Sequence, residues 1–141
     1  MKREIRFFTE GVDYLIREKG KIRLWVEGAV EKEGYVPGEL NFIICTDKYL
    51  QKINRKYLNN RLLTDVIAFN FSEREHEVCG EIYISLERVR ENAKKYKQTI
   101  KMELKRVMIH GVLHLMGYND HNENEIGIMR EKEAYYLAGY S

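Results

Sequence analysis

The sequence has little proline, little cysteine and no long hydrophobic run. Proline occurs once in 141 residues, and no apolar stretch approaches the roughly 20 residues that cross a bilayer. The N-terminal residues 1–8 are too charged and too short of apolar length to be a signal peptide. We therefore expect a cytoplasmic protein with no membrane partner.

Cysteine is scarce as well, since Cys45 and Cys79 are the only two. Each lies in an apolar run, and neither has a second cysteine or a histidine beside it at the spacing of metal ligands. We expect both to be buried free thiols.

The chain also has little net charge, +2 from 24 basic and 22 acidic residues, so the average favours no polyanionic partner. The basic residues are nevertheless clustered: within residues 48–61 they are Lys48, Lys52, Arg55, Lys56 and Arg61. Such a segment can bind phosphates, although it is more commonly a solvated helix face.

Hydrophobic residues make up 44% of the chain and aromatic residues 11%, which favours a folded domain over a disordered chain. No repeat or low-complexity linker divides it. We expect one domain over residues 1–141.

Hydrophobic periodicity and helix caps predict a single small mixed sheet flanked by helices, an α/β or α+β fold. The expected strands are residues 5–8, 22–26, 40–45, 65–71 and 79–85, and the expected helices are residues 11–19, 47–57, 86–96, 100–115 and 123–137. Thr46 or Asp47, and then Ser85, are the expected helix caps. Residues 34–38, around Pro37, are expected to form a loop.

One predicted helix carries two histidines, His110 and His114, at a spacing of four. Residues four apart lie roughly 40° apart around a helix, so both imidazoles can reach one ion. Gly117 lets the chain leave the helix and curl back, which brings Asp120 or His121 toward the same ion. Three ligands with an open position form the arrangement that activates water, and we predict a helix-borne metal site.

A core role and a peptidase role for the histidine pair are both weaker hypotheses. A lone histidine on an apolar face is usually a hydrogen-bonded core residue, but three of the four histidines lie within residues 110–121. The spacing is also that of the zinc protease pattern His-Glu-x-x-His. Gly111 stands where a protease has its general-base glutamate, so a peptidase would need a carboxylate from elsewhere in the chain.

Residues 110–118, His-Gly-Val-Leu-His-Leu-Met-Gly-Tyr, resemble the signature of the YbeY endoribonuclease family, His-Gly-x-Leu-His-Leu-x-Gly-Tyr-Asp-His. The resemblance extends to Asn54 and Tyr57, to residues 64–69, Thr-Asp-Val-Ile-Ala-Phe, and to residues 80–85, Gly-Glu-Ile-Tyr-Ile-Ser. It covers roughly the last two-thirds of the chain.

The resemblance implies a metal-dependent endoribonuclease that favours single strands and acts in ribosome biogenesis, notably on RNA of the small ribosomal subunit. It implies one zinc ion, although the histidine pair also suits nickel or another divalent transition metal. The ion would activate water against a phosphodiester while basic side chains hold the RNA backbone.

The sequence departs from the family pattern in two places. The position of the family's third histidine is Asp120, and His121 follows one residue later. We favour Asp120 as the third ligand because no gap need be invoked and a carboxylate can bind zinc. The second departure is Leu58, where the family has an arginine thought to act on the RNA phosphate.

Several further residues are candidates for catalysis or RNA binding. Arg55 or Arg61 could replace the missing arginine, and Lys56 could add to their RNA-binding charge, although each could equally be a plain surface residue. Asp65 could orient a ligand histidine through its second nitrogen or shape the cleft, or it could only terminate a strand or cap a turn. Tyr57 and Phe69 could stack on bases, although packing is the default for an aromatic residue.

The main alternative to an enzyme is a non-catalytic RNA-binding factor associated with the ribosome. In that case the metal would stabilise the C-terminal helices, and the basic segment of residues 48–61 would bind ribosomal RNA. Leu58 gives this alternative its weight, since the family's catalytic arginine is missing.

Overall fold

The computed structural model describes residues 4–57 and 65–140. Four strands and five helices lie in these two ranges. In chain order they are β1 (Glu4–Glu10), α1 (Lys19–Lys32), β2 (Val36–Cys45), α2 (Asp47–Tyr57), β3 (Val66–Asn70), β4 (Glu77–Ser85), α3 (Leu86–Lys95), α4 (Ile100–Leu115) and α5 (Glu123–Ala138). The predicted fold class, one small mixed sheet flanked by helices, is confirmed.

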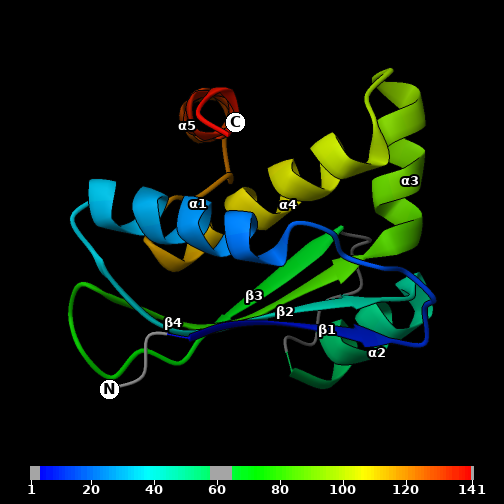
Figure 1. Cartoon of the computed structure of the whole chain (residues 1–141), viewed down its shortest axis with the longest axis horizontal. Helices are drawn as coiled ribbons and strands as arrows, with labels where there is room; N and C mark the ends of the chain where they lie inside the picture. Colours follow the sequence, from blue (N-terminus) through cyan, green and yellow to red (C-terminus); the bar gives the residue numbers. More distant parts are fainter. Residues whose placement is uncertain (1–3, 58–64, 141) are drawn as a thin grey trace.

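The strands form one sheet in the order β1-β2-β4-β3. β1, β2 and β4 are parallel, and β3 pairs antiparallel with β4 at the edge. Helices α1 and α4 cover one face of the sheet, α5 lies above them, and α2 lies on the opposite face (Figure 1). The sheet therefore separates two helical sides of unequal size.

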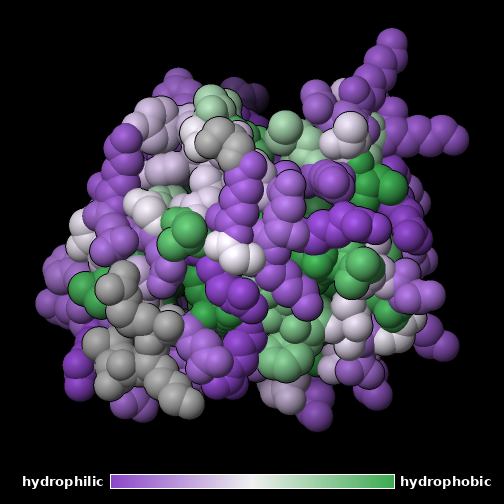
Figure 2. All heavy atoms as spheres, viewed as in Figure 1, coloured by the Kyte–Doolittle hydropathy of each residue, from purple (hydrophilic) through white to green (hydrophobic). Residues whose placement is uncertain are grey.

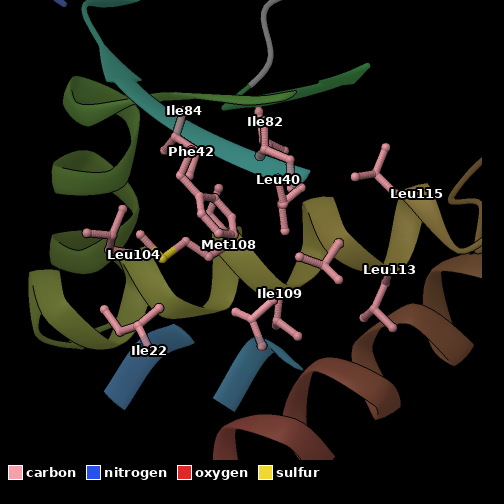
Figure 3. Close-up of a cluster of buried hydrophobic side chains, with 14 of the residues drawn as sticks. Ile22, Leu40, Phe42, Ile82, Ile84, Leu104, Met108, Ile109, Leu113 and Leu115 are labelled. Carbon is pink, nitrogen blue, oxygen red and sulfur yellow. The ribbon is translucent and has the colours of Figure 1, made fainter. Parts of the chain in front are cut away.

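The larger core lies between the sheet and α4. Fully buried side chains of the central strands, such as Phe42 and Ile82, point at α4, and Met108 lies beneath Phe42 (Figure 3). The residues between His110 and His114, which are Gly111, Val112 and Leu113, are buried in this helix. Burial of this face holds α4, and with it the histidine pair, against the sheet.

Strand β3 contributes to both faces of the sheet because its side chains alternate. Val66 and Ala68 pack in the core on the α4 side. Ile67 and Phe69 pack in a smaller cluster under α2, which also contains Leu50.

The first third of the chain differs from the sequence-based prediction. Residues 11–18 form a loop, and the predicted strand over residues 22–26 is part of α1, in which Gly20 lies in the first turn. Ile22 and Val26 fit a period of two as well as a helical spacing of four. Leu24 decides between them, because it is 73% exposed while Ile22 and Val26 are buried.

The predicted loop of residues 34–38 is also wrong in part, because β2 begins at Val36 and includes Pro37. The register of β2 against β4 shifts between Pro37 and Leu40, an irregularity of the kind that accommodates proline within a sheet. The remaining elements fall within two residues of their predicted bounds. Both cysteines are free as expected, but Cys79 is only half-buried.

Hydrophilic side chains cover most of the face seen in Figure 2, with apolar side chains in patches between them. No helix in the described part of the chain is long and apolar enough to span a membrane.

Candidate metal centre

Gly111 brings α4 close to the sheet beside the histidine pair. A Cβ at this position would lie 2.7 Å from Cγ2 of Ile82 in β4, so only glycine fits without movement of the neighbouring side chain. A glutamate here would project into the core of the protein and not beside His110. The protease pattern is therefore excluded by packing as well as by sequence.

Helix α4 ends in a Schellman motif that turns the chain back toward the histidines. The amide of Gly117 donates to the carbonyl of His114, and the amide of Tyr118 donates to the carbonyl of Leu113. Gly117 has φ +95°, a left-handed conformation that L side chains rarely adopt. This turn directs the following residues, including Asp120, across the end of α4.

Three potential ligand atoms converge there, one each from His110, His114 and Asp120. The two Nε2 atoms are 3.0 Å apart, and Oδ2 of Asp120 lies 3.5 Å from that of His110 and 3.4 Å from that of His114. Ligand atoms about 2.1 Å from a tetrahedral ion lie about 3.4 Å from one another. The three residues therefore fit a divalent transition metal in spacing and in donor chemistry.

Glu133 of α5 orients His110 from behind. Its Oε2 lies 2.5 Å from Nδ1 of His110, and its side chain is buried. An ionised carboxylate only accepts, so Nδ1 carries a proton, and Nε2 faces His114 and Asp120. A carboxylate on the second nitrogen is the usual support of a metal-binding histidine.

Arg106, one turn before His110 on α4, keeps Glu133 charged. Its guanidinium lies 3.1 Å from Glu133 and 2.6 Å from Glu103, a second buried carboxylate. Burial opposes ionisation of Glu133, but the hydrogen bond with His110 and the charge of Arg106 outweigh it and lower the pKa of Glu133.

His114 is held in its neutral form by its surroundings. Burial lowers its pKa, the neighbouring His110 lowers it further, and Asp120 acts in the opposite direction. A hydrogen bond to the backbone of Tyr118 holds the ring. A neutral imidazole is the form that binds a metal ion.

The structure separates the two candidates for the third ligand. Asp120 lies beside both histidines, whereas the side chain of His121 is 79% exposed and lies 3.9 Å from Glu125. His121 is not among the three grouped residues.

In the described structure, the side chain of Asp65 contacts Arg106 and Asn92 and not a ligand histidine. Its Oδ2 lies 3.5 Å from Arg106 and 3.5 Å from Asn92, and Nδ1 of His110 is bound by Glu133 instead. Among the described residues, Arg106 links Asp65 to the site. The predicted role of Ser85 is confirmed, because its hydroxyl accepts from the amide of Arg88 as the cap of α3.

Two of the basic candidates, Arg55 and Lys56, lie elsewhere. Arg55 and Lys56 are exposed on α2, the helix on the other face of the sheet (Figure 1). Leu58 and Arg61 lie outside the described residues.

Sequence reasoning missed Glu133, Arg106 and Glu103. One signal for Glu133 was present: it follows the buried Met129 by four residues and precedes the buried Tyr136 by three, so an acid occupies the apolar face of α5. A buried acid at such a position requires a partner, and here the partners are His110 and Arg106.

Comparison with known proteins gives a consistent result. The family model "Endoribonuclease YbeY" matches residues 13–141, which extends the resemblance upstream of its motifs. A curated protein named Endoribonuclease YbeY from Flavobacterium psychrophilum is 48% identical to the chain, and the match covers 89% of both sequences. A protein of the same name from Cytophaga hutchinsonii is 44% identical, and the match covers 94% of both sequences. The solution structure of a Thermotoga maritima protein matches with a TM-score of 0.63 and 29% identity over 95% of this chain and 87% of that one.

Proposed function

The chain belongs to the YbeY endoribonuclease family, and from this premise we propose that it hydrolyses RNA with a divalent metal ion held by His110, His114 and Asp120. The observation that carries the proposal is the convergence of one ligand atom from each of these residues. We propose zinc as the ion, because two imidazoles and one carboxylate are ligands that zinc accepts. His121 is proposed to remain in solvent.

The protein's own residues prepare this site before any ion or substrate arrives. Glu133 binds Nδ1 of His110, and burial lowers the pKa of His114, so the two Nε2 atoms are left to face an ion. Asp120 adds a negative charge at the exposed side of the pair. When bound, a divalent ion supplies Lewis acidity toward a phosphoryl oxygen and toward water.

We propose single-stranded RNA as the substrate, and RNA of the small ribosomal subunit as the natural target. Support for this target is membership of the family, whose model matches residues 13–141. The site has an exposed side, since the Asp120 side chain is 39% exposed, and a flexible single strand is suited to approach it. We place this activity in the cytoplasm.

The test compares His114→Ala with His121→Ala in untagged protein. Metal content is measured by mass spectrometry, and cleavage is measured on a labelled single-stranded RNA. We expect His114→Ala to lose both bound metal and cleavage, because it removes one of three ligands. We expect His121→Ala, which removes an exposed histidine from the loop that follows α4, to keep both. Cleavage that survives in metal-free His114→Ala protein contradicts the proposal.

The same assay tests Asp120. Asp120→Asn keeps the size of the side chain but removes its charge, and Asn119→Ala is a neighbouring control in the same loop. We expect metal affinity to fall by roughly tenfold or more in Asp120→Asn alone. Equal metal affinity in the two variants would remove Asp120 from the ligand set.

A further inference from the structure

Helix α2 carries a row of cations that the fold does not use. Lys48, Lys52, Arg55 and Lys56 are all exposed. No ion pair joins any of them to an acid within residues 4–57 and 65–140. By contrast, Arg88 and Arg106, which also lie on helices, are bound by carboxylates. The charge on α2 is therefore available to a ligand.

Aromatic rings lie beside this row, at the edge of the sheet. Phe69 of β3 contacts three other rings, those of Tyr57, Phe71 and Tyr83, at centroid distances of 5.7, 6.4 and 5.8 Å. Tyr57 is 59% exposed and Phe71 is 56% exposed. Two large rings are therefore presented to solvent although each already contacts the packed Phe69.

The cations and the rings line two adjoining hollows on the α2 side of the sheet. One hollow, of about 640 Å³, is lined by residues of α2 and its cap, including all four cations. The other, of about 370 Å³, lies between α2 and the strands and is lined by the rings. Tyr49, Lys52 and Lys56 line both hollows, and we call the continuous feature the α2 groove. The acid that lines it, Glu81, accepts a hydrogen bond from Tyr83.

We propose that the α2 groove binds a single-stranded segment of RNA outside the catalytic centre, with phosphates on the cations and bases on Tyr57 and Phe71. The combination of a positive groove with exposed aromatic faces is the one by which proteins bind single strands without reading sequence. The inference rests on the proposed function only in taking RNA as the substrate. The groove lies on the opposite face of the sheet from α4, so it holds RNA that flanks the point of cleavage (Figure 1).

The experiment measures binding of a fluorescein-labelled oligouridine of about 12 nucleotides by fluorescence anisotropy. All variants carry His114→Ala, so that binding is measured without cleavage. The test variant is Lys52→Glu with Lys56→Glu on α2. The matched control is Arg90→Glu with Lys94→Glu on α3, which has the same spacing, the same change in charge and exposed positions. Thermal unfolding checks that each variant is folded.

We expect the α2 double variant to bind at least about tenfold more weakly than the parent, and the α3 control within about threefold. Loss of two phosphate contacts lowers the slope of log Kd against log salt by roughly 1.4. Phe71→Ala is expected to weaken binding about tenfold with no change in this slope, because it removes a stacking surface and no charge. Phe71→Trp restores binding.

A second measurement uses the native histidines and follows cleavage. The α2 double variant should raise KM and leave kcat within about twofold, since the groove binds substrate in the ground state and the transition state alike. If the α2 variant and Phe71→Ala bind oligouridine as tightly as the parent, the proposal is wrong and the surface is left for a protein partner. Failure of the metal proposal would appear as cleavage in metal-free protein, and it would not alter these binding results.

Discussion

The two sides of the sheet use charge in opposite ways. On the α4 side, Glu133 and Glu103 are buried, and both bind Arg106. On the α2 side, Lys52 and Lys56 are exposed and form no ion pair with an acid in the described ranges. Buried charges fix the position of neighbouring atoms, as Glu133 does for His110, whereas exposed charges attract a polyanion without fixing its position. Substitutions on the two sides should therefore differ in kind.

The largest effect is expected at Glu133. Glu133→Gln removes a buried charge and leaves Arg106 with Glu103 as its remaining close buried partner, so the free energy of unfolding should fall by about 3 kcal/mol. The hydrogen-bond acceptor behind His110 is weakened too, and metal affinity should fall roughly 10–100-fold. Chemical denaturation and metal titration measure the two effects.

Glu131→Gln is the control for Glu133, since Glu131 is an exposed acid on the same helix. Glu131→Gln should change neither the free energy of unfolding nor the free energy of metal binding by more than about 0.5 kcal/mol. If both variants behave alike, the buried carboxylate does not support the histidine pair.

A second comparison involves two helical glycines. Gly111→Ala places a methyl group against Ile82 and should destabilise the protein by about 1–3 kcal/mol. Gly127→Ala on α5 meets nothing within 4 Å and should stabilise the protein by about 0.5–1 kcal/mol, because alanine is the better helix former. The unfolding temperatures of the two variants should move in opposite directions. A rise in both would show that the contact between α4 and the sheet is looser than described.

On the α4 side of the sheet, the contribution of Glu33 to stability can be tested by changing the pH. Its carboxylate accepts hydrogen bonds from Tyr118, Tyr136 and Lys132, which outweigh the opposing effect of burial and lower its pKa below the ordinary 4.5. A lowered pKa stabilises the fold above pH 4.5, and this contribution is lost as the pH falls further. Glu33→Gln should therefore cost about 1–2 kcal/mol at pH 7 and less at acid pH.

Denaturation curves at several pH values measure the contribution of Glu33. The wild-type and Glu33→Gln proteins should converge as the pH is lowered. A gap that stays constant down to acid pH would mean that the charge of Glu33 contributes nothing.

The smallest effect on stability is expected on the α2 side. Lys56→Ala should change the free energy of unfolding by no more than about 0.5 kcal/mol, since its described partner is the exposed ring of Tyr57 at 5.3 Å. RNA affinity should fall in the same variant. A large loss of stability in Lys56→Ala would show that Lys56 supports the fold. Substitutions on the α4 and α2 sides would then not differ as proposed.

The sequence predicted the elements that have local signals. Ser85 caps α3 and Gly117 ends α4, so these ends could be placed from neighbouring residues. In α1 the cap residue is Glu18, which makes no side-chain cap, and the hydrophobic pattern fits two periods. Tertiary packing, and not a local signal, makes this segment a helix.

The candidate site divides in the same way. His110 and His114 could be found because both lie on one helix at one spacing. Glu133 could not, because it lies 23 residues after His110 and only the packing of α5 on α4 brings the two together. The choice between Asp120 and His121 depended on the path of the chain after Gly117, which a sequence leaves open.

The alternation of side chains along β3 restricts which insertions this strand can accept. Ala68 faces the histidine side and Phe69 faces the α2 groove, although they are consecutive residues. Insertion of one residue before them would exchange the two faces and disturb both surfaces at once, whereas insertion of two would keep each side chain on its own face. Natural or engineered variants with a longer β3 should therefore differ in length by even numbers.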